Sequence, residues 1–351
     1  MTTGGRSVIT PSPTRPRVGI VVIGRNEGSR LLRCLGSIDP TLPAVYVDSG
    51  SDDGSPDHAS RLGMDVVRLD TASPFTAARA RNTGIDHLLA AMPALDFVQM
   101  IDGDCEMMPG WIDAAIAAMA ANSALGAVFG RLRERCADRS LYNWLCEVEW
   151  AVPPGPAHAF GGNVLLRSAA VTAAGGYRGA MIAGEEPDLS IRMRRMGWDI
   201  VCIDREMMVH DAAIYRFSQW WRRTARAGHA FAQLASLHPG SGAPDYRRTC
   251  RSILIWGAVI PLIGLIGVGG ALSGRRIGFI LLGLSLLLPL LQVARLTVRE
   301  SRHWPVTRAL ALALSLTVGK YAEITGMIRF HADRLRDRPS TIIEYKRRGP
   351  R

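Results

Sequence analysis

Two aspartates separated by one glycine, Asp102-Gly103-Asp104, stand at the end of the apolar run DFVQMID, residues 96–102. At the end of a strand both carboxylates can bend toward one cation, and hard oxygen ligands suit Mg²⁺ or Mn²⁺ shared with phosphates. Such a cation neutralises the charge of a departing diphosphate. An ordinary acidic turn has the same residues, so the prediction of a metal site depends on what surrounds it.

Two further segments could bind a nucleotide. The turn DSGSDDGS, residues 48–55, follows an apolar run. The Asp48 carboxylate can accept hydrogen bonds from a base or a ribose, and the glycines allow close backbone approach. Arg81 lies in the segment ARNTG, which we expect to start a helix, and a helix N-terminus favours anions. The plainer interpretations are a solvated loop and a surface arginine.

The elements that position these residues alternate between strands and helices. Strands are predicted at residues 18–23, 44–48, 64–69 and 96–102, with helices at 27–38 and 82–91. This alternation predicts an open α/β sheet, in which ligands bind beyond the carboxyl ends of the strands. We therefore expect Asn26, Asp48 and Asp102 at one rim. Later elements are predicted as helices at 111–121 and 140–150 and as strands at 126–135 and 199–203.

Taken in this order, the motifs resemble glycosyltransferase family 2 over roughly residues 17–235. The resemblance implies the GT-A fold, a Rossmann-like open mixed sheet flanked by helices, and inversion of configuration at the transferred sugar. The matching elements are Asn26-Glu27, Asp48, Arg81 to Gly84, Asp102 to Asp104, Gly161-Gly162-Asn163 and Gly175-Gly176-Tyr177.

The resemblance also implies roles for the matching positions. Asp104, Asp102 and His210, which follows the late strand, are the implied ligands of Mg²⁺ or Mn²⁺. The implied partner is a nucleotide-diphosphate-sugar, with UDP-sugars favoured as donors. The implied donor contacts are Asn26, Glu27, Asp48, Arg81, Asp102, Gly162 and Asn163.

The catalytic base is expected at Glu185 or Glu186, where the family has Glu-Asp. Inversion by direct displacement needs one carboxylate to deprotonate the attacking hydroxyl, whereas glycoside hydrolysis needs two that flank the bond. Glutamate in place of aspartate lengthens the reach by one methylene, so the choice between the two stays open. An acidic helix N-terminus, favoured by the helix dipole, is the alternative.

Acceptor or interface contacts are predicted further along the chain. Processive relatives have Gln-x-x-Arg-Trp, whereas this sequence has QWWRR at residues 219–223. Arginine in the last position favours a single-addition enzyme over a cellulose-synthase-like polymerase. Tryptophan and arginine also suit a helix at the level of lipid headgroups. The candidates are Asp188, Gln219, Trp220 and Arg222.

The composition points to anionic partners. Lys plus Arg number 42 against 31 Asp plus Glu, a net charge of +11, which favours phosphates and acidic lipids. The chain has neither an RNA-binding signature nor zinc-finger spacing, so nucleic acid is not an expected partner. Six cysteines without a CxxC pair suggest reduced thiols. Residues 1–16 lack an apolar core and predict a flexible tail, not a signal peptide.

After residue 240 the sequence changes character. Residues 253–272 and 277–294 are uncharged runs of 20 and 18 residues, each long enough to cross a hydrocarbon core of about 30 Å. We expect a transmembrane hairpin; two buried core helices are the alternative. Basic flanks place the catalytic domain and the loop after the hairpin on the cytoplasmic side of a multi-pass protein of the inner membrane. The flanking arginines are Arg247, Arg248, Arg251, Arg295, Arg299 and Arg302.

A shorter apolar run, within residues 305–328, precedes a basic C-terminal tail. A crossing would leave that tail outside, against the positive-inside tendency, so an interfacial or re-entrant helix is expected.

The predicted organisation is a tail at 1–16, a catalytic domain at 17–240 and a membrane region at 241–351.

The sequence thus predicts a metal-dependent, inverting glycosyltransferase with a lipid-linked or polysaccharide acceptor at the membrane. One alternative is a membrane-bound nucleotide-sugar-binding protein without transfer activity. Another is a nucleotidyltransferase, which would have a basic, glycine-rich phosphate loop after the first strand. Here that loop is Gly24-Arg25-Asn26-Glu27-Gly28.

Overall fold

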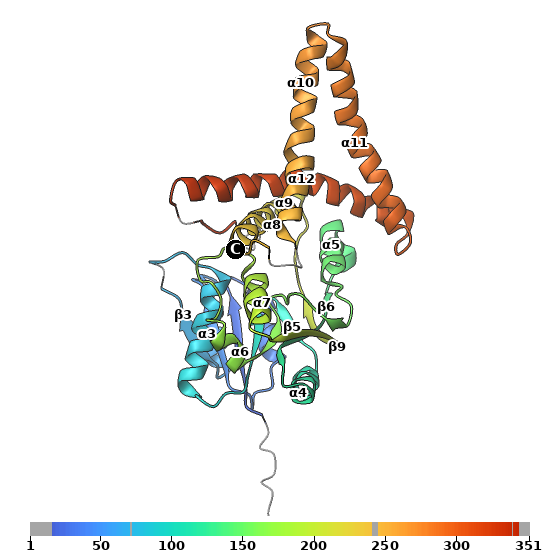
Figure 1. Ribbon diagram of the computed structural model, residues 1–351. Helices are drawn as coiled ribbons and strands as arrows, with labels where there is room; N and C mark the ends of the chain where they lie inside the picture. The colour runs from blue at the N-terminus through green and yellow to red at the C-terminus, as the bar shows by residue number, and fades with distance from the viewer. Residues whose placement is uncertain (1–15, 71, 241–244, 339, 344–351) are drawn as a thin grey trace, which may run out of the picture.

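The computed structural model describes residues 16–70, 72–240, 245–338 and 340–343. A nine-stranded mixed sheet with flanking helices forms the lower body in Figure 1, and a helical hairpin rises from its upper side. The strands run in the order β3-β2-β1-β4-β8-β6-β9-β5, with β7 paired to β9. The predicted open α/β sheet is confirmed. The predicted N-terminal tail, apart from residue 16, lies outside the described residues.

One half of the sheet is parallel and was predicted closely. It contains β3 (Asp65–Arg68), β2 (Ala44–Asp48), β1 (Val18–Gly24) and β4 (Phe97–Asp102). The interiors of β1 and β2 are fully buried, as continuous apolar runs with both faces covered require. Gly24 is paired with Asp48 and Ile23 with Asp102. The carboxyl ends of these strands therefore form the single rim that the sequence predicts.

The other half of the sheet departs from the prediction. It contains β8 (Val164–Arg167), β6 (Leu125–Glu134), β9 (Asp199–His210), β5 (Cys105–Met107) and the short β7 (Gly155–Pro156). β5 and β8 were missed, since three or four residues carry little periodicity. β9 continues to His210, beyond the expected end at residue 203. This longer strand sets His210 opposite both Cys105 and Glu134.

Helices pack on the sheet around one large apolar core. The expected start of the third helix at Asn82 was wrong, because Thr76 accepts a hydrogen bond from Arg79 N and caps a helix that begins at Ala77. Arg81 therefore lies in the second turn. The helices of this body are α1 (Ser29–Gly36), α2 (Ser55–Arg61), α3 (Ala77–Ala91), α4 (Trp111–Ala121), η1 (Ala137–Arg139), α5 (Leu141–Trp150), α6 (Ser168–Ala173), α7 (Glu185–Arg195) and α8 (Phe217–Leu237).

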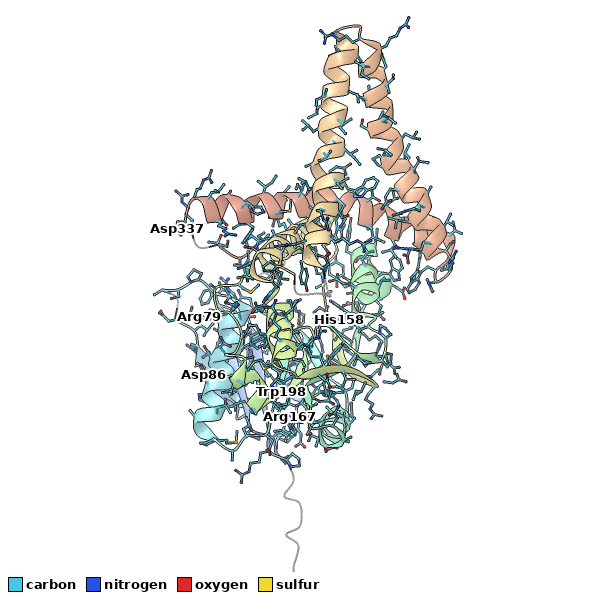
Figure 2. All side chains as sticks on the ribbon, viewed as in Figure 1. Arg79, Asp86, His158, Arg167, Trp198 and Asp337 are labelled. Carbon is cyan, nitrogen blue, oxygen red and sulfur yellow. The ribbon has the colours of Figure 1, made fainter. Side chains whose placement is uncertain are left out.

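The hairpin begins with α9 (Tyr246–Leu254) and continues through η2 (Ile255–Val259) into α10 (Ile260–Leu272), which packs against α11 (Arg276–Glu300). Residues 246–272 and 276–300 are long and apolar enough to cross a membrane, judged by length and composition over the described residues. Only 22% and 6% of their most apolar windows are buried, so they are not core helices. Figure 2 shows their side chains projecting outward.

The last helix, α12 (Val306–Leu335), runs crosswise below the hairpin in Figure 1 and packs on α8. The two backbones approach closely at glycines. A Cβ on Gly228 would lie 2.0 Å from the carbonyl oxygen of Glu323, and one on Gly326 would lie 1.8 Å from that of Ala225. Any side chain at these two positions would force the helices apart. Because α12 packs on both α8 and α11, it connects the catalytic domain to the hairpin.

Candidate active site

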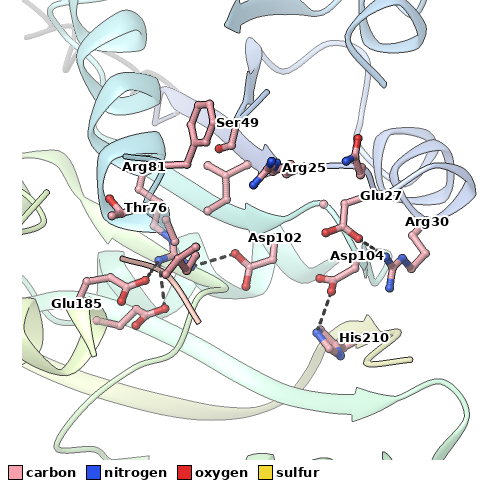
Figure 3. Close-up of a pocket in the computed structure, with 18 of the residues that line it drawn as sticks. Arg25, Glu27, Arg30, Ser49, Thr76, Arg81, Asp102, Asp104, Glu185 and His210 are labelled. Carbon is pink, nitrogen blue, oxygen red and sulfur yellow. Dashed lines mark hydrogen bonds and ion pairs between the residues drawn. The ribbon is translucent and has the colours of Figure 1, made fainter. Parts of the chain in front are cut away.

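One pocket opens at the rim of the sheet, between the ends of β1 and β4 and the N-terminus of α7. Its lining includes His210 and five acidic side chains, those of Glu27, Asp102, Asp104, Glu185 and Glu186. Figure 3 shows three groups of contacts in this pocket: one around Arg81, a second between Asp104 and His210, and a third between Glu27 and Arg30. The predicted metal ligands and both candidate bases thus share one cleft.

Arg81 binds three of these carboxylates. Its guanidinium lies 2.9 Å from Asp102 Oδ1, 2.8 Å from Glu185 Oε1 and 3.1 Å from Glu186 Oε1. The side chain is buried, and its guanidinium lies 5.5 Å from the centre of the Tyr177 ring. The sequence suggested a phosphate-binding arginine. In the structure its charge joins the DxD motif to the acidic start of α7, and its role toward a phosphate stays a prediction.

Glu186 has a perturbed pKa. Burial, followed by the charge of Glu185, raises the pKa of Glu186 to about 7, against the lowering effect of Arg81. Its side chain is 17% exposed, whereas that of Glu185 is 5% exposed. Of the two candidate bases, Glu186 is therefore the more open to the pocket. A carboxylate that titrates near neutral pH is matched to proton transfer.

The second group of contacts offers ligands for a cation. Atoms of Asp104, Cys105 and His210 lie within 4.8 Å of one another, and His210 Nε2 is 3.3 Å from Asp104 Oδ2. Burial raises the pKa of the Cys105 thiol well above its usual value, so this residue is a poor partner for a hard cation. A carboxylate and an imidazole suit Mn²⁺ or Mg²⁺, so the residues present fit a divalent cation.

The GGN element packs against the turn that contains Asp102 and Asp104. A Cβ on Gly162 would lie 2.2 Å from Asp102 Oδ2 and 2.7 Å from Arg81 Nη2, so only glycine fits. Asn163 is buried; its side-chain oxygen accepts from Asp102 N at 3.1 Å, and its amide donates to Cys105 Sγ at 3.2 Å. The structure therefore places Gly162 and Asn163 against the DxD turn.

Asn26 and Asp48 lie at the carboxyl ends of β1 and β2, at the rim of the sheet. Asn26 adopts a φ of 56°, and its Oδ1 accepts a hydrogen bond from Asp52 N at 2.8 Å. Asp48 is 2% exposed and accepts hydrogen bonds from Gly50 N, Ser51 N and the Tyr46 hydroxyl. Asp48 thus builds the turn, while Asn26 and Glu27 line the pocket.

The predicted acceptor or interface residues lie at other places in the structure. Asp188 is fully buried and binds Arg178, Arg192 and His238 at 2.7–2.9 Å. Gln219 accepts hydrogen bonds from backbone amides at the start of α8. Trp220 stacks on Tyr142 with ring centres 5.9 Å apart, and Arg222 is exposed. The structure thus accounts for Asp188 and Gln219 as parts of the scaffold.

Several pocket residues were missed in the sequence. Phe75 stacks under the guanidinium of Arg25 at 5.2 Å, and Arg226 lies one helical turn after Arg222 on α8. The turn spacing could have indicated Arg226. Ile342 comes from a segment beyond α12, and its neighbour Ser340 lies 3.0 Å from His229 Nε2. No local pattern marks a residue that reaches the pocket from the far end of the chain.

A mixed sheet flanked by helices with a carboxylate-lined pocket at its rim defines the GT-A class of fold. The mannosyltransferase PcManGT from Pyrobaculum calidifontis, solved with GDP-Man and Mn²⁺, superposes with a TM-score of 0.60 at 18% identity, covering 92% of this chain and 88% of that one. TarS 1-349 from S. aureus gives a TM-score of 0.50 at 12% identity, covering 86% and 92%. These likenesses support the fold.

Residues 19–180 match the family described as Glycosyl transferase family 2. A pre-mycofactocin glycosyltransferase of Mycobacterium tuberculosis is 28% identical over 250 residues, which are 66% of this chain and 50% of the relative. The chain thus spans about half the length of the curated relatives it matches. The predicted family and fold are confirmed.

Proposed function

We propose that this glycosyltransferase moves a sugar from a nucleotide-diphosphate-sugar to a lipid-linked or saccharide acceptor, with inversion at the sugar. The observation that carries the proposal is the shared pocket, in which Glu186 and the pair Asp104 and His210 face the same space. A donor diphosphate held beside the pair would present its sugar toward α7. UDP-sugars remain the favoured donors, and GDP-sugars are included because PcManGT was solved with GDP-Man.

Glu186 is the proposed base. As the acceptor oxygen attacks the anomeric carbon, the bond from that carbon to the diphosphate breaks and the hydroxyl proton passes to Glu186. Arg81 keeps Glu186 oriented through its contact at 3.1 Å. Glu185, which is more deeply buried and lies 2.8 Å from the same guanidinium, is proposed to hold Arg81 in place.

Asp104 and His210 are the proposed cation ligands, with Asp102 beside them. A bound Mn²⁺ or Mg²⁺ would supply positive charge to the leaving diphosphate. Asn26, Glu27, Arg81, Gly162 and Asn163 remain proposed donor-side residues. Their contacts support a role in shaping the donor site.

Membrane attachment through the hairpin is part of the proposal. The two apolar helices and their arginine flanks favour an inner-membrane protein with its catalytic domain in the cytoplasm. α12, whose outer side carries apolar residues such as Leu310 and Leu314, is proposed to lie at the interface. Trp220 and Arg222 are proposed to lie close to the lipid headgroups, where they could meet a lipid-linked acceptor.

The test uses the full chain purified in detergent and reconstituted in vesicles. Nucleotide-sugars, with Mn²⁺ or Mg²⁺, are offered together with lipid-linked and free saccharide acceptors, and product anomers are assigned by NMR. We expect transfer from one donor with inversion, and Glu186→Gln is expected to abolish turnover while retaining donor binding. Donor binding without transfer across the panel would favour the binding-protein alternative, and release of pyrophosphate from a nucleoside triphosphate would favour a nucleotidyltransferase.

A further inference from the structure

Glu134 lies behind His210, on the side away from Asp104. It is the last residue of β6 and is paired with His210 in the register of β6 and β9. Its Oε2 is 3.3 Å from His210 Nδ1, while His210 Nε2 is 3.3 Å from Asp104 Oδ2. The imidazole therefore stands between two carboxylates, one at the pocket and one in the interior.

Backbone amides determine how Glu134 faces the ring. Its Oε1 accepts a hydrogen bond from Cys136 N at 3.2 Å, and its Oε2 accepts one from Ala212 N at 3.0 Å. Because a backbone N–H can only donate, both oxygens of Glu134 act as acceptors. The nitrogen that faces Oε2 must then be a donor. With a cation bound by Nε2 and Asp104, as proposed, the one proton of a neutral His210 is on Nδ1.

This tautomer leaves the lone pair of Nε2 directed at Asp104. A metal-binding histidine needs such a lone pair, and its other nitrogen commonly donates to a carboxylate that fixes the orientation of the ring. The ring of Trp150 packs edge-on against His210 with centres 4.3 Å apart, which restricts rotation further. Glu134 is buried, with a side chain that is 0% exposed, so its contacts are within the protein.

We propose that Glu134 is a positioning residue that holds His210 in the tautomer and orientation required to bind the divalent cation with Asp104. This inference rests on the proposed function, because the cation site belongs to it. A purely structural role, in which Glu134 only binds the backbone at Cys136 and Ala212, predicts a loss of stability without a specific change at His210.

The experiment measures Mn²⁺ binding directly on the full chain in detergent, without substrate. Electron paramagnetic resonance titration gives the affinity, and electron spin echo modulation from ¹⁵N-labelled histidine reports whether an imidazole is bound to Mn²⁺. Glu134→Gln keeps the shape of the side chain but replaces one acceptor by a donor. We expect Mn²⁺ affinity to fall by about 10-fold to 100-fold and the histidine signal to weaken. His210→Gln is expected to remove that signal, and it serves as the reference for complete loss of histidine binding to Mn²⁺.

Glu206→Gln is the matched control. Glu206 lies on β9 near His210 but pairs with the exposed Arg133, so Mn²⁺ affinity and the histidine signal are expected to stay at wild-type values. Glu134→Asp keeps the charge and withdraws it from the ring by one methylene. It is expected to weaken the signal as well, and it serves if Glu134→Gln fails to fold.

The outcomes separate this inference from the proposed function. A wild type that binds Mn²⁺ with a histidine signal, together with folded Glu134 variants of unchanged affinity and signal, overturns the positioning role and leaves the function standing. A wild type that binds no Mn²⁺ overturns both. In the double variant Glu134→Gln with His210→Gln, we expect no further loss of affinity beyond His210→Gln alone, and a further loss would assign Glu134 a purely structural role.

Discussion

Glu186 and Asp102 lie on different halves of the domain but share one cation, the guanidinium of Arg81, at 3.1 and 2.9 Å. Glu185 is a third carboxylate on the same group. Three acids around a single arginine leave an excess of negative charge in a buried place, and this excess favours protonation of one of them. The structure therefore couples the DxD turn electrostatically to the proposed base.

The rate of transfer is predicted to rise with pH through about 7. Glu186 must be deprotonated to accept the proton of the hydroxyl, and burial with the nearby charge of Glu185 raises its pKa to about 7. We expect kcat/KM to fall tenfold per pH unit below that value. The measurement is a kcat/KM profile between pH 5 and 9 at saturating Mn²⁺. A profile that is flat through this range would contradict the assignment of Glu186.

The same shift has a consequence for stability. The folded state holds the Glu186 proton more tightly than the unfolded state, whose pKa stays near 4.5. The contribution of Glu186 to the free energy of unfolding is therefore fully present below about pH 4.5 and is lost as the pH rises through about 7. Glu186→Gln is expected to remove this part of the pH dependence, as measured by thermal unfolding between pH 4.5 and 8 and compared with wild type.

Removal of Arg81 is predicted to destabilise the fold. Arg81→Met leaves the buried carboxylate of Glu185 and the partly buried carboxylates of Asp102 and Glu186 without their common partner. Breaking a buried ion pair, such as that of Arg81 with Glu185, costs about 3–5 kcal/mol. The loss in the free energy of unfolding should be smaller at pH 5 than at pH 8, because the acids can take up protons. Arg68→Met is the control, since Arg68 forms an exposed pair with Asp57, worth about 0–1 kcal/mol. Equal effects of the two variants would refute the coupling.

Gly162 is predicted to be sensitive to a single methyl group. In Gly162→Ala the new Cβ would overlap Asp102 Oδ2 and Arg81 Nη2, and displacement of catalytic groups by about 1 Å can lower turnover by about 100-fold. Gly161→Ala is the matched control, because a Cβ there meets no atom within 4 Å of the described residues. We expect the control to keep wild-type kcat. A variant Gly162→Ala with full activity would show that the turn is not held as tightly as described.

The parallel half of the sheet and the rim were predictable because local patterns determine them. Strand ends place Asp48 and Asp102 at one rim, on the two strands that flank β1, whichever helices follow, and the register confirms it. Antiparallel β5 and β8 are short, and their pairing depends on segments far along the chain. The proposed role of Glu134 depends on the pairing of β6 with β9, which joins residues 76 positions apart, so no local sequence pattern could indicate it.

The ion-pair partners of the charged site residues were harder to predict than the places of these residues in the fold. Arg81 and Glu185 are separated by 104 residues, and spacing alone does not reveal that an arginine expected to bind an anion also pairs with acidic side chains of the protein. Asp188, expected as an acceptor or interface residue, is buried and binds Arg178, Arg192 and His238. In both cases the sequence indicates that a residue is charged, while the tertiary packing selects its counter-ion.

Ile342 is predicted to affect substrate affinity more than the chemical step. It lines the pocket from the C-terminal segment, and that segment is held by Arg329, which donates to the carbonyl oxygen of Thr341 at 2.9 Å. Ile342→Ala removes apolar side-chain atoms from the lining of the pocket, and such a change alters the binding free energy of a substrate by about 1–3 kcal/mol at most. We expect KM for one substrate to rise by about tenfold with kcat unchanged. Ile343→Ala, at the adjacent position, is the control and should keep both constants. A fall in kcat without a change in KM would instead mean that the C-terminal segment contributes to catalysis and is more than a wall of the pocket.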